Sequence, residues 1–180
     1  MLGVVFTEFM EMVEDKFSFE VADQILEASG VGADTGFTAV AYYEHADLVR
    51  LVVALKDATG LEIDELVQTF GAYLFSRFNV NYPDLFESMA DSLDFLERVE
   101  DYIHVEVRKL YPKAELPTFK CTRLDENRLE MVYKSLRPFG DLAQGLIAGC
   151  GEFFGETLAI ERTDLDGASE VRFLISRQAA

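Results

Sequence analysis

The hydrophobic pattern of this 180-residue chain changes at Pro112. Before this residue, apolar side chains recur every three or four positions, as they do in amphipathic helices. After it come four short strand-like runs, and one helical segment, 139–154, separates the first two runs from the last two. This order predicts an α+β fold with a roughly four-stranded, mostly antiparallel sheet and flanking helices. The strand-like runs are 118–124, 128–137, 157–163 and 169–176.

Helical segments fill most of the chain before Pro112. The first segment carries apolar residues on one face and most of its carboxylates on the other. Gly60 ends the third segment as a C-cap and marks an expected seam between a helical N-terminal part, residues 1–60, and the remainder, residues 61–180. The second to fifth helical segments are 19–28, 44–58, 62–78 and 93–111, with a loop at 32–38 and a break at 79–83.

His104 lies at the margin of the apolar stripe of segment 93–111. Glu97, Glu100 and Arg108 surround it on the helical wheel. One interpretation is a surface histidine paired with Glu100, one turn earlier. The other is an imidazole that packs inward and offers a ring nitrogen. The helix alone favours the surface interpretation.

Composition narrows the function classes. The net charge of −17 opposes binding to nucleic acid or to anionic membranes. No run approaches the ~18–20 apolar residues of a membrane span, and the N-terminus does not resemble a signal peptide. Cys121 and Cys150 are expected to be free thiols in a reducing compartment, so the protein is expected to be cytoplasmic. Fifteen phenylalanines suit an aromatic core or a pocket for a flat apolar ligand.

No motif indicates an enzyme. Carboxylates are abundant, but none can be paired from the sequence as a general acid and base. Gly145, Gly149, Gly151 and Gly155 lack the Lys-Ser/Thr ending of a phosphate loop and the spacing of a dinucleotide loop. We expect these glycines to permit close packing of a helix on the sheet.

The second strand-like run contains a row of side chains that donate hydrogen bonds. By the period-2 rule, Tyr133, Ser135 and Arg137 share one face with Leu129 and Met131. Two interpretations are open: a solvent-facing edge, or a grip for a pair of carboxylates, to which two hydroxyls and a guanidinium are suited.

These residues together resemble a known family. His104, about thirty residues before Tyr133-x-Ser135-x-Arg137 and with Leu116-Pro117 between, is similar to the pattern of the haem-nitric oxide/oxygen-binding (H-NOX) domain. This family is related to the haem sensor domain of soluble guanylate cyclase. The resemblance covers essentially the whole chain, from Met1-x-Gly3 to the final hairpin, and the chain resembles stand-alone bacterial nitric oxide sensors.

The resemblance implies a haem b cofactor and a role for each motif residue. His104 matches the proximal ligand, whose neutral imidazole would coordinate the iron as its only protein axial ligand. Tyr133, Ser135 and Arg137 match the residues that hold the two haem propionates. Pro117 matches the proline that presses on the porphyrin and distorts it.

The resemblance also implies which gas binds. In dioxygen-binding members a distal tyrosine donates a hydrogen bond to the ligand, and here that position is Leu142. The position of a distal amide falls at Leu74, although a shift of one residue would place Tyr73 there. Val5, Phe9 and Phe78 would complete an apolar wall. Such a pocket favours nitric oxide and carbon monoxide and excludes dioxygen.

The implied function is therefore a sensor and not an enzyme. Nitric oxide would weaken the bond between iron and His104, and a separate signalling enzyme would distinguish the two states. The partner in bacterial members is typically a histidine kinase or a cyclic-di-GMP synthase or phosphodiesterase. The alternatives are a haem-free regulatory interaction module of the same fold and, less favoured, a haem enzyme.

Overall fold

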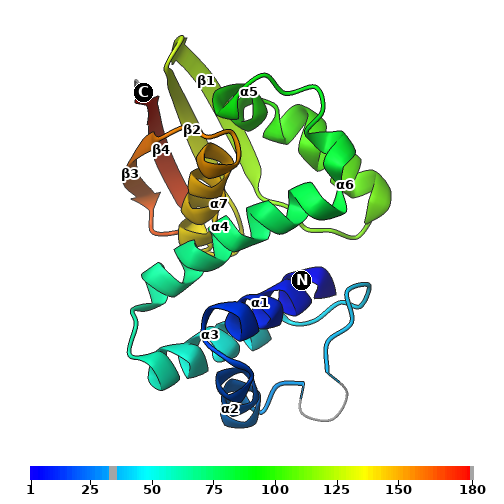
Figure 1. Ribbon diagram of the computed structural model, residues 1–180. Helices are drawn as coiled ribbons and strands as arrows, with labels where there is room; N and C mark the ends of the chain where they lie inside the picture. Colours follow the sequence, from blue (N-terminus) through cyan, green and yellow to red (C-terminus); the bar gives the residue numbers. More distant parts are fainter. Residues whose placement is uncertain (33–35, 179–180) are drawn as a thin grey trace. The chain divides into compact units, whose positions relative to one another are not determined.

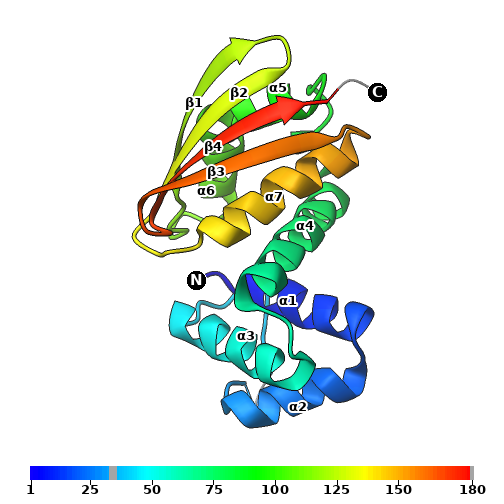
Figure 2. The same ribbon diagram turned by 90° about the vertical axis from the view of Figure 1, so that its left-hand side faces the viewer.

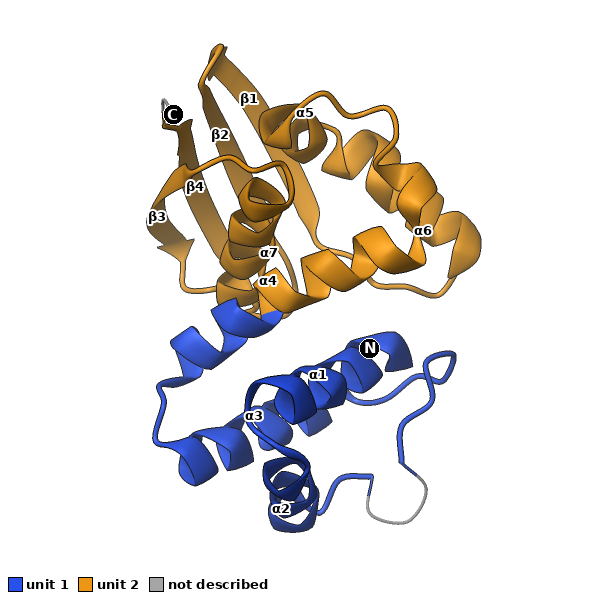
Figure 3. Ribbon diagram, in the orientation of Figure 1, with its two compact units in different colours: residues 1–70 blue, residues 71–180 orange. Residues whose placement is uncertain are grey.

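The computed structural model describes residues 1–32 and 36–178 and divides into two compact units, residues 1–70 and 71–180. Figure 3 shows that the division falls inside one helix, α4 (Ile63–Asn81). The expected seam near Gly60 lies just before this helix. Of the predicted loop 32–38, residues 33–35 lie outside the described part. Within the described ranges, no helix is both long and apolar enough to cross a membrane.

The first unit is helical, as the sequence predicts. It contains α1 (Gly3–Lys16), α2 (Phe19–Ser29), α3 (His45–Thr59) and the first part of α4 (Figure 1). Phe9 stacks edge-on against Phe70, with ring centroids 5.2 Å apart. Burial of one such ring stabilises the fold by ~1.5–3 kcal/mol. The other large buried side chains of this unit include Phe6, Met12, Ile25, Leu51, Leu55 and Leu66.

Two positions of the first unit require glycine for structural reasons. Gly60 follows α3 with φ 75°, and its N–H donates to the Lys56 carbonyl, so the predicted glycine C-cap is confirmed. Gly3 lies so close to the next loop that a Cβ there would be 1.9 Å from the Thr38 carbonyl oxygen. A side chain at position 3 would therefore force the chain apart.

The second unit contains the sheet. Its strands are β1 (Thr118–Asp125), β2 (Arg128–Lys134), β3 (Leu158–Asp166) and β4 (Glu170–Arg177), in the order β1-β2-β4-β3 and antiparallel throughout (Figure 2). The helix α5 (Ser92–Glu97) packs on β1 and β2, and α7 (Gly140–Phe153) packs on β3 and β4. The predicted α+β fold is confirmed.

Three predicted boundaries are wrong. The fourth helix continues to Asn81, through the start of the break expected at 79–83, and a short 3₁₀ turn, Pro83–Leu85, follows. The second strand ends at Lys134 rather than at residue 137. Segment 93–111 is not one regular α-helix: a π-helical turn, Val99–Ile103, separates α5 from α6 (His104–Leu110).

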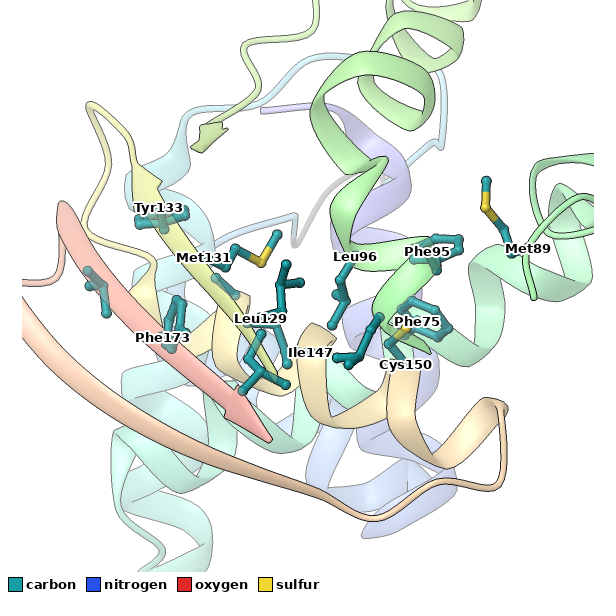
Figure 4. Close-up of a cluster of buried hydrophobic side chains, with 14 of the residues drawn as sticks. Phe75, Met89, Phe95, Leu96, Leu129, Met131, Tyr133, Ile147, Cys150 and Phe173 are labelled. Atoms are coloured by element: carbon teal, nitrogen blue, oxygen red, sulfur yellow. The ribbon is translucent and has the colours of Figure 1, made fainter. Parts of the chain in front are cut away.

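The core of the second unit lies between the sheet and α4, α5 and α7. Figure 4 shows Leu129, Met131 and Tyr133 of β2 pointing toward the helices, and an aromatic group around Phe75 and Phe95. The rings of Phe75 and Phe95 lie 5.2 Å apart in an edge-to-face arrangement.

Glycines allow α4 and α7 to approach each other closely. A Cβ at Gly71 would lie 2.8 Å from the Gly145 Cα, and a Cβ at Gly149 would lie 2.9 Å from the Ala72 Cα. The expected role of the α7 glycines in close packing is thus correct, but Gly145 and Gly149 face a helix and not the sheet. Gly151 lies against a strand, at Leu158, as does Gly140, at Val171. For Gly155 the expectation is wrong, because a Cβ there would meet nothing within 4 Å.

Candidate functional site

His104 is the residue directly after the π-helical turn Val99–Ile103. The Ile103 N–H donates to the Arg98 carbonyl, five residues earlier, and the His104 N–H donates to Val99 in the same pattern. Such turns insert one residue into a helix and occur frequently at functional sites. The His104 side chain is only 10% exposed. The surface interpretation of His104 is therefore wrong, whereas its expected pairing with Glu100 is present.

Glu100 fixes the orientation of the imidazole. Its Oε2 atom lies 3.2 Å from His104 Nδ1 and also accepts the Phe119 N–H at 3.0 Å. A carboxylate accepts hydrogen bonds, so the arrangement assigns the proton to Nδ1 and the lone pair to Nε2. Within residues 1–32 and 36–178, Glu100 is the only hydrogen-bond partner of this side chain. Nε2 is thus available as a ligand.

The electrostatics favour a neutral imidazole. Burial lowers the pKa of His104, and this effect outweighs the opposing influence of Glu100. Burial alone would raise the pKa of Glu100, but the Phe119 N–H, His104 and Arg108 together lower it. A neutral imidazole beside an ionised carboxylate is the state that binds a metal ion through nitrogen.

Aromatic rings connect the histidine with the sheet. The Phe119 ring of β1 lies 5.7 Å from the His104 ring, and 5.6 Å from the Tyr133 ring of β2. The structure therefore brings His104 and Tyr133 to neighbouring positions around one phenylalanine. Sequence reasoning missed Phe119, whose only signal is its apolar character two residues after Pro117.

The donor row has a different geometry from the one predicted. Ser135 and Arg137 follow the end of β2, so they do not share a strand face with Tyr133. Instead the three residues form a hydrogen-bonded loop. The Tyr133 hydroxyl donates to the Arg137 carbonyl at 3.0 Å, and the Arg137 N–H donates to Ser135 Oγ at 3.1 Å. The Ser135 N–H in turn donates to the Ser169 carbonyl.

This loop positions the Arg137 guanidinium. The guanidinium forms an ion pair with the carboxylate of Glu115. The side chain of Glu115 is 74% exposed, whereas that of Arg137 is 22% exposed. Burial raises the pKa of the Tyr133 phenol, which therefore stays a neutral donor. The Arg137 guanidinium is thus placed to bind a carboxylate, as the interpretation of the row as a carboxylate-binding site requires.

The remaining predicted residues lie in both units. Pro117 is half-buried directly before β1. In the second unit Leu74 is buried on α4, Phe78 is half-buried one turn later, and Leu142 is half-buried on α7. In the first unit, on α1, Phe9 is buried and Val5 is half-buried. Their assignment to a distal pocket stays a prediction.

The donor set fits haem rather than a bare metal ion. No three His, Cys, Asp or Glu side chains within the described ranges are grouped to hold a metal. A single buried imidazole with a free Nε2, an apolar and aromatic neighbourhood, and an arginine that takes a carboxylate match what an iron porphyrin with acidic side chains needs. The fold is that of a haem sensor domain, and this set of residues fits such a domain.

The chain belongs to the family described as Haem-NO-binding, whose model matches residues 2–162. This is a family of sensor domains and not of enzymes. Among curated proteins the chain is 25% identical, over 76% of its length, to soluble guanylate cyclase gcy-37 of Caenorhabditis elegans. It is also 25% identical to soluble guanylate cyclase 89Db of Drosophila melanogaster. The chain spans about one fifth of these relatives.

Solved structures share the fold over the full chain. The Fe(II) unliganded H-NOX protein from K. algicida is 35% identical, with a TM-score of 0.92, and the match covers 100% of this chain and 98% of the other. The H-NOX from Shewanella woodyi, solved in the Fe(II)CO state, is 42% identical, with a TM-score of 0.84 and coverages of 99% and 95%. The H-NOX protein from S. oneidensis in the Fe(II)NO state is 25% identical, with a TM-score of 0.91 and coverages of 99% and 100%.

Proposed function

We propose that this chain is a cytoplasmic sensor that binds nitric oxide and carbon monoxide at a ferrous haem b and excludes dioxygen. The observation that carries the proposal is His104: buried, neutral, bonded to Glu100 through Nδ1 and with Nε2 left for iron. The H-NOX proteins from S. oneidensis and S. woodyi were solved with nitric oxide and carbon monoxide bound, and this supports the same gases here.

The proposed site residues have three tasks. His104 would supply the nitrogen that coordinates the iron. Tyr133 and Ser135 hold the loop that presents Arg137, whose guanidinium pairs with a propionate. Pro117, in the segment between α6 and β1, would contact the porphyrin. Haem supplies the iron that binds the gas, and the protein supplies position, charge and exclusion of water.

Gas selectivity follows from apolar distal residues. Leu74, Phe78 and Leu142, together with Val5 and Phe9 of the first unit, offer no side-chain hydrogen-bond donor. Bound dioxygen is polar and needs a donor, whereas nitric oxide and carbon monoxide do not. The proposed pocket therefore discriminates by the absence of a hydrogen bond.

Signalling follows from the single bond between protein and iron. If nitric oxide broke that bond, α6 would no longer be tied to the iron, and the chain would have two states that a partner could distinguish. We propose that residues 1–60 respond to the change relative to residues 61–180. The proposed partner is a separate histidine kinase or a cyclic-di-GMP synthase or phosphodiesterase.

Absorption spectroscopy tests the function. Purified protein should show a Soret band, its ferrous spectrum should not change on exposure to air, and nitric oxide should convert it to a spectrum without the histidine ligand. Colourless protein that does not take up added haem would favour the haem-free module. A stable new spectrum in air would contradict the exclusion of dioxygen.

The proximal ligand has its own test. His104→Ala should lose haem unless imidazole is added to fill the vacant position. His45→Ala is the matched control, because His45 is the other histidine of the chain and lies at the start of α3. Wild-type haem content in His104→Ala would show that the ligand is elsewhere.

A further inference from the structure

We propose that Glu100 is a positioning residue that sets the strength of the bond between His104 and the haem iron. This inference rests on the proposed function, because it requires His104 to be the axial ligand. It adds a residue outside the motif that identifies the family. It also concerns how readily the bond breaks, and not only which residue forms it.

The Glu100 carboxylate is held from two elements. It belongs to the π-helical turn before His104, and its Oε2 accepts the Phe119 N–H from the start of β1. The contact of Oε1 with Arg108 is 3.5 Å long, too long for a strong hydrogen bond. The backbone of β1 is therefore the main anchor, and it aims the carboxylate at Nδ1.

The charge of the acceptor determines how strongly the imidazole donates. A carboxylate that accepts the Nδ1 proton increases the electron density on Nε2 and so strengthens its bond to a metal. A neutral amide at the same place would do this less, and an aliphatic side chain would not do it. Glu100 thus opposes the bond breakage on which the proposed signal depends.

The same geometry ties the histidine to the sheet. If His104 separated from the iron, it would remain bonded to a carboxylate that β1 also holds. The imidazole therefore keeps its tautomer and its orientation for rebinding. Loss of the hydrogen bond from Glu100 should favour the state in which the iron–histidine bond is broken, and should slow the re-formation of that bond.

Resonance Raman spectroscopy of the unliganded ferrous protein tests the inference, because the iron–histidine stretching band reports the bond directly. We expect the highest frequency in the wild type, a lower one in Glu100→Gln and the lowest in Glu100→Leu. Haem transfer to an excess of apomyoglobin should be about 10–100-fold faster for Glu100→Leu, as is typical when the partner of a ligating histidine is removed.

Glu97→Gln is the matched control. Glu97 is a carboxylate of the adjoining helix α5, but it pairs with Arg123 at 3.1 Å, whereas the His104 side chain pairs with Glu100. This variant should keep the wild-type band. Glu100→Gln retains an oxygen that can accept the Phe119 N–H. If Glu100→Leu does not fold, Glu100→Gln still tests the effect of removing the charge.

The outcomes separate this inference from the proposed function. Unchanged frequencies in both Glu100 variants, with haem lost from His104→Ala, would overturn the role of Glu100 and leave His104 as the ligand. An iron–histidine band that persists in His104→Ala would overturn the proposed function itself. A graded decrease in the Glu100 variants, with no change in Glu97→Gln, would support both.

Discussion

The hydroxyl groups of Tyr82 and Tyr111 lie 2.7 Å apart and join the end of α4 to the end of α6. Tyr82 directly follows α4, and Tyr111 is the C-terminal cap of α6. The helix that begins with His104 is therefore held at both ends. Glu100 connects its start to β1, and the tyrosine pair connects its end to α4.

Removal of one hydroxyl from this pair should lower the stability of the protein. Tyr111→Phe is expected to reduce the free energy of unfolding by about 0.5–1.5 kcal/mol, because a half-buried hydrogen bond is lost. Urea unfolding measures the change. Tyr102→Phe, whose hydroxyl has no partner within the described ranges, is the control and should be near neutral. If Tyr82→Phe and Tyr111→Phe are additive in the double variant, the two hydroxyls are not coupled.

Glu115 should compete with the haem propionates for Arg137. Glu115→Gln removes the carboxylate that pairs with the guanidinium, so haem dissociation should become slower, whereas Arg137→Ala should make it faster. The rate of haem transfer to apomyoglobin measures both effects. Glu106→Gln is the control, because Glu106 pairs with Lys109 on α6 and not with Arg137. Equal rates in Arg137→Ala and the wild type would remove Arg137 from the site.

A hydrogen-bond donor at position 142 should admit dioxygen. Leu142→Tyr places a hydroxyl at the position that the family resemblance assigns to a distal donor, and a stable new absorption spectrum in air is expected. Leu142→Phe has nearly the same size without the hydroxyl and should behave like the wild type. A tyrosine variant that remains unchanged in air would show that this position does not face the gas.

The thiol of Cys121 should be unreactive in the folded protein. Burial, and then the charges of Glu97, Asp101 and Glu100, raise its pKa to about 12. Iodoacetamide at pH 8 should therefore modify it far more slowly than in urea-unfolded protein. Mass spectrometry of the peptide that contains Cys121 measures the rate, and fast labelling of the native protein would contradict the burial.

The raised pKa of Cys121 has a consequence for stability. The folded state keeps the thiol proton up to about pH 12, whereas the unfolded chain loses it near the ordinary thiol pKa of 9.0. Between these values the folded state binds more protons, so stability is fully present below pH 9 and is lost as the pH rises toward 12. Cys121→Ser should reduce this alkaline loss. Cys150, whose pKa burial also raises, should retain its own contribution.

The sequence predicts most elements because their signals are local. Helix and strand periods locate α1 to α4, the sheet and α7 within a few residues. The predicted extent of β2 is wrong for a non-local reason. Lys134 pairs with Thr118, the first residue of β1, and with Glu170, the first residue of β4, so β2 ends where its antiparallel neighbours begin. No period within 128–137 contains that information.

The candidate site shows the same limit. The spacing of Val99 and Ile103 is compatible with an α-helix and with a π-helical turn, so periodicity does not predict the turn. The burial of His104 depends on Phe119, which comes from a strand fifteen residues later. The Glu100 pairing is predictable because it is separated by one turn of the same segment. The sequence pattern does not contain information about which distant elements contact each other.

The π-helical turn also affects how this chain can be compared with others. It contains one residue more than a regular α-helical turn would need, so deletion of a single residue within 99–103 would restore a continuous helix. The extra residue is accommodated within the turn itself, so the residues on either side keep about the same helical phase with or without it. An alignment that preserves helical phase across this segment must therefore include a gap of one residue at the turn.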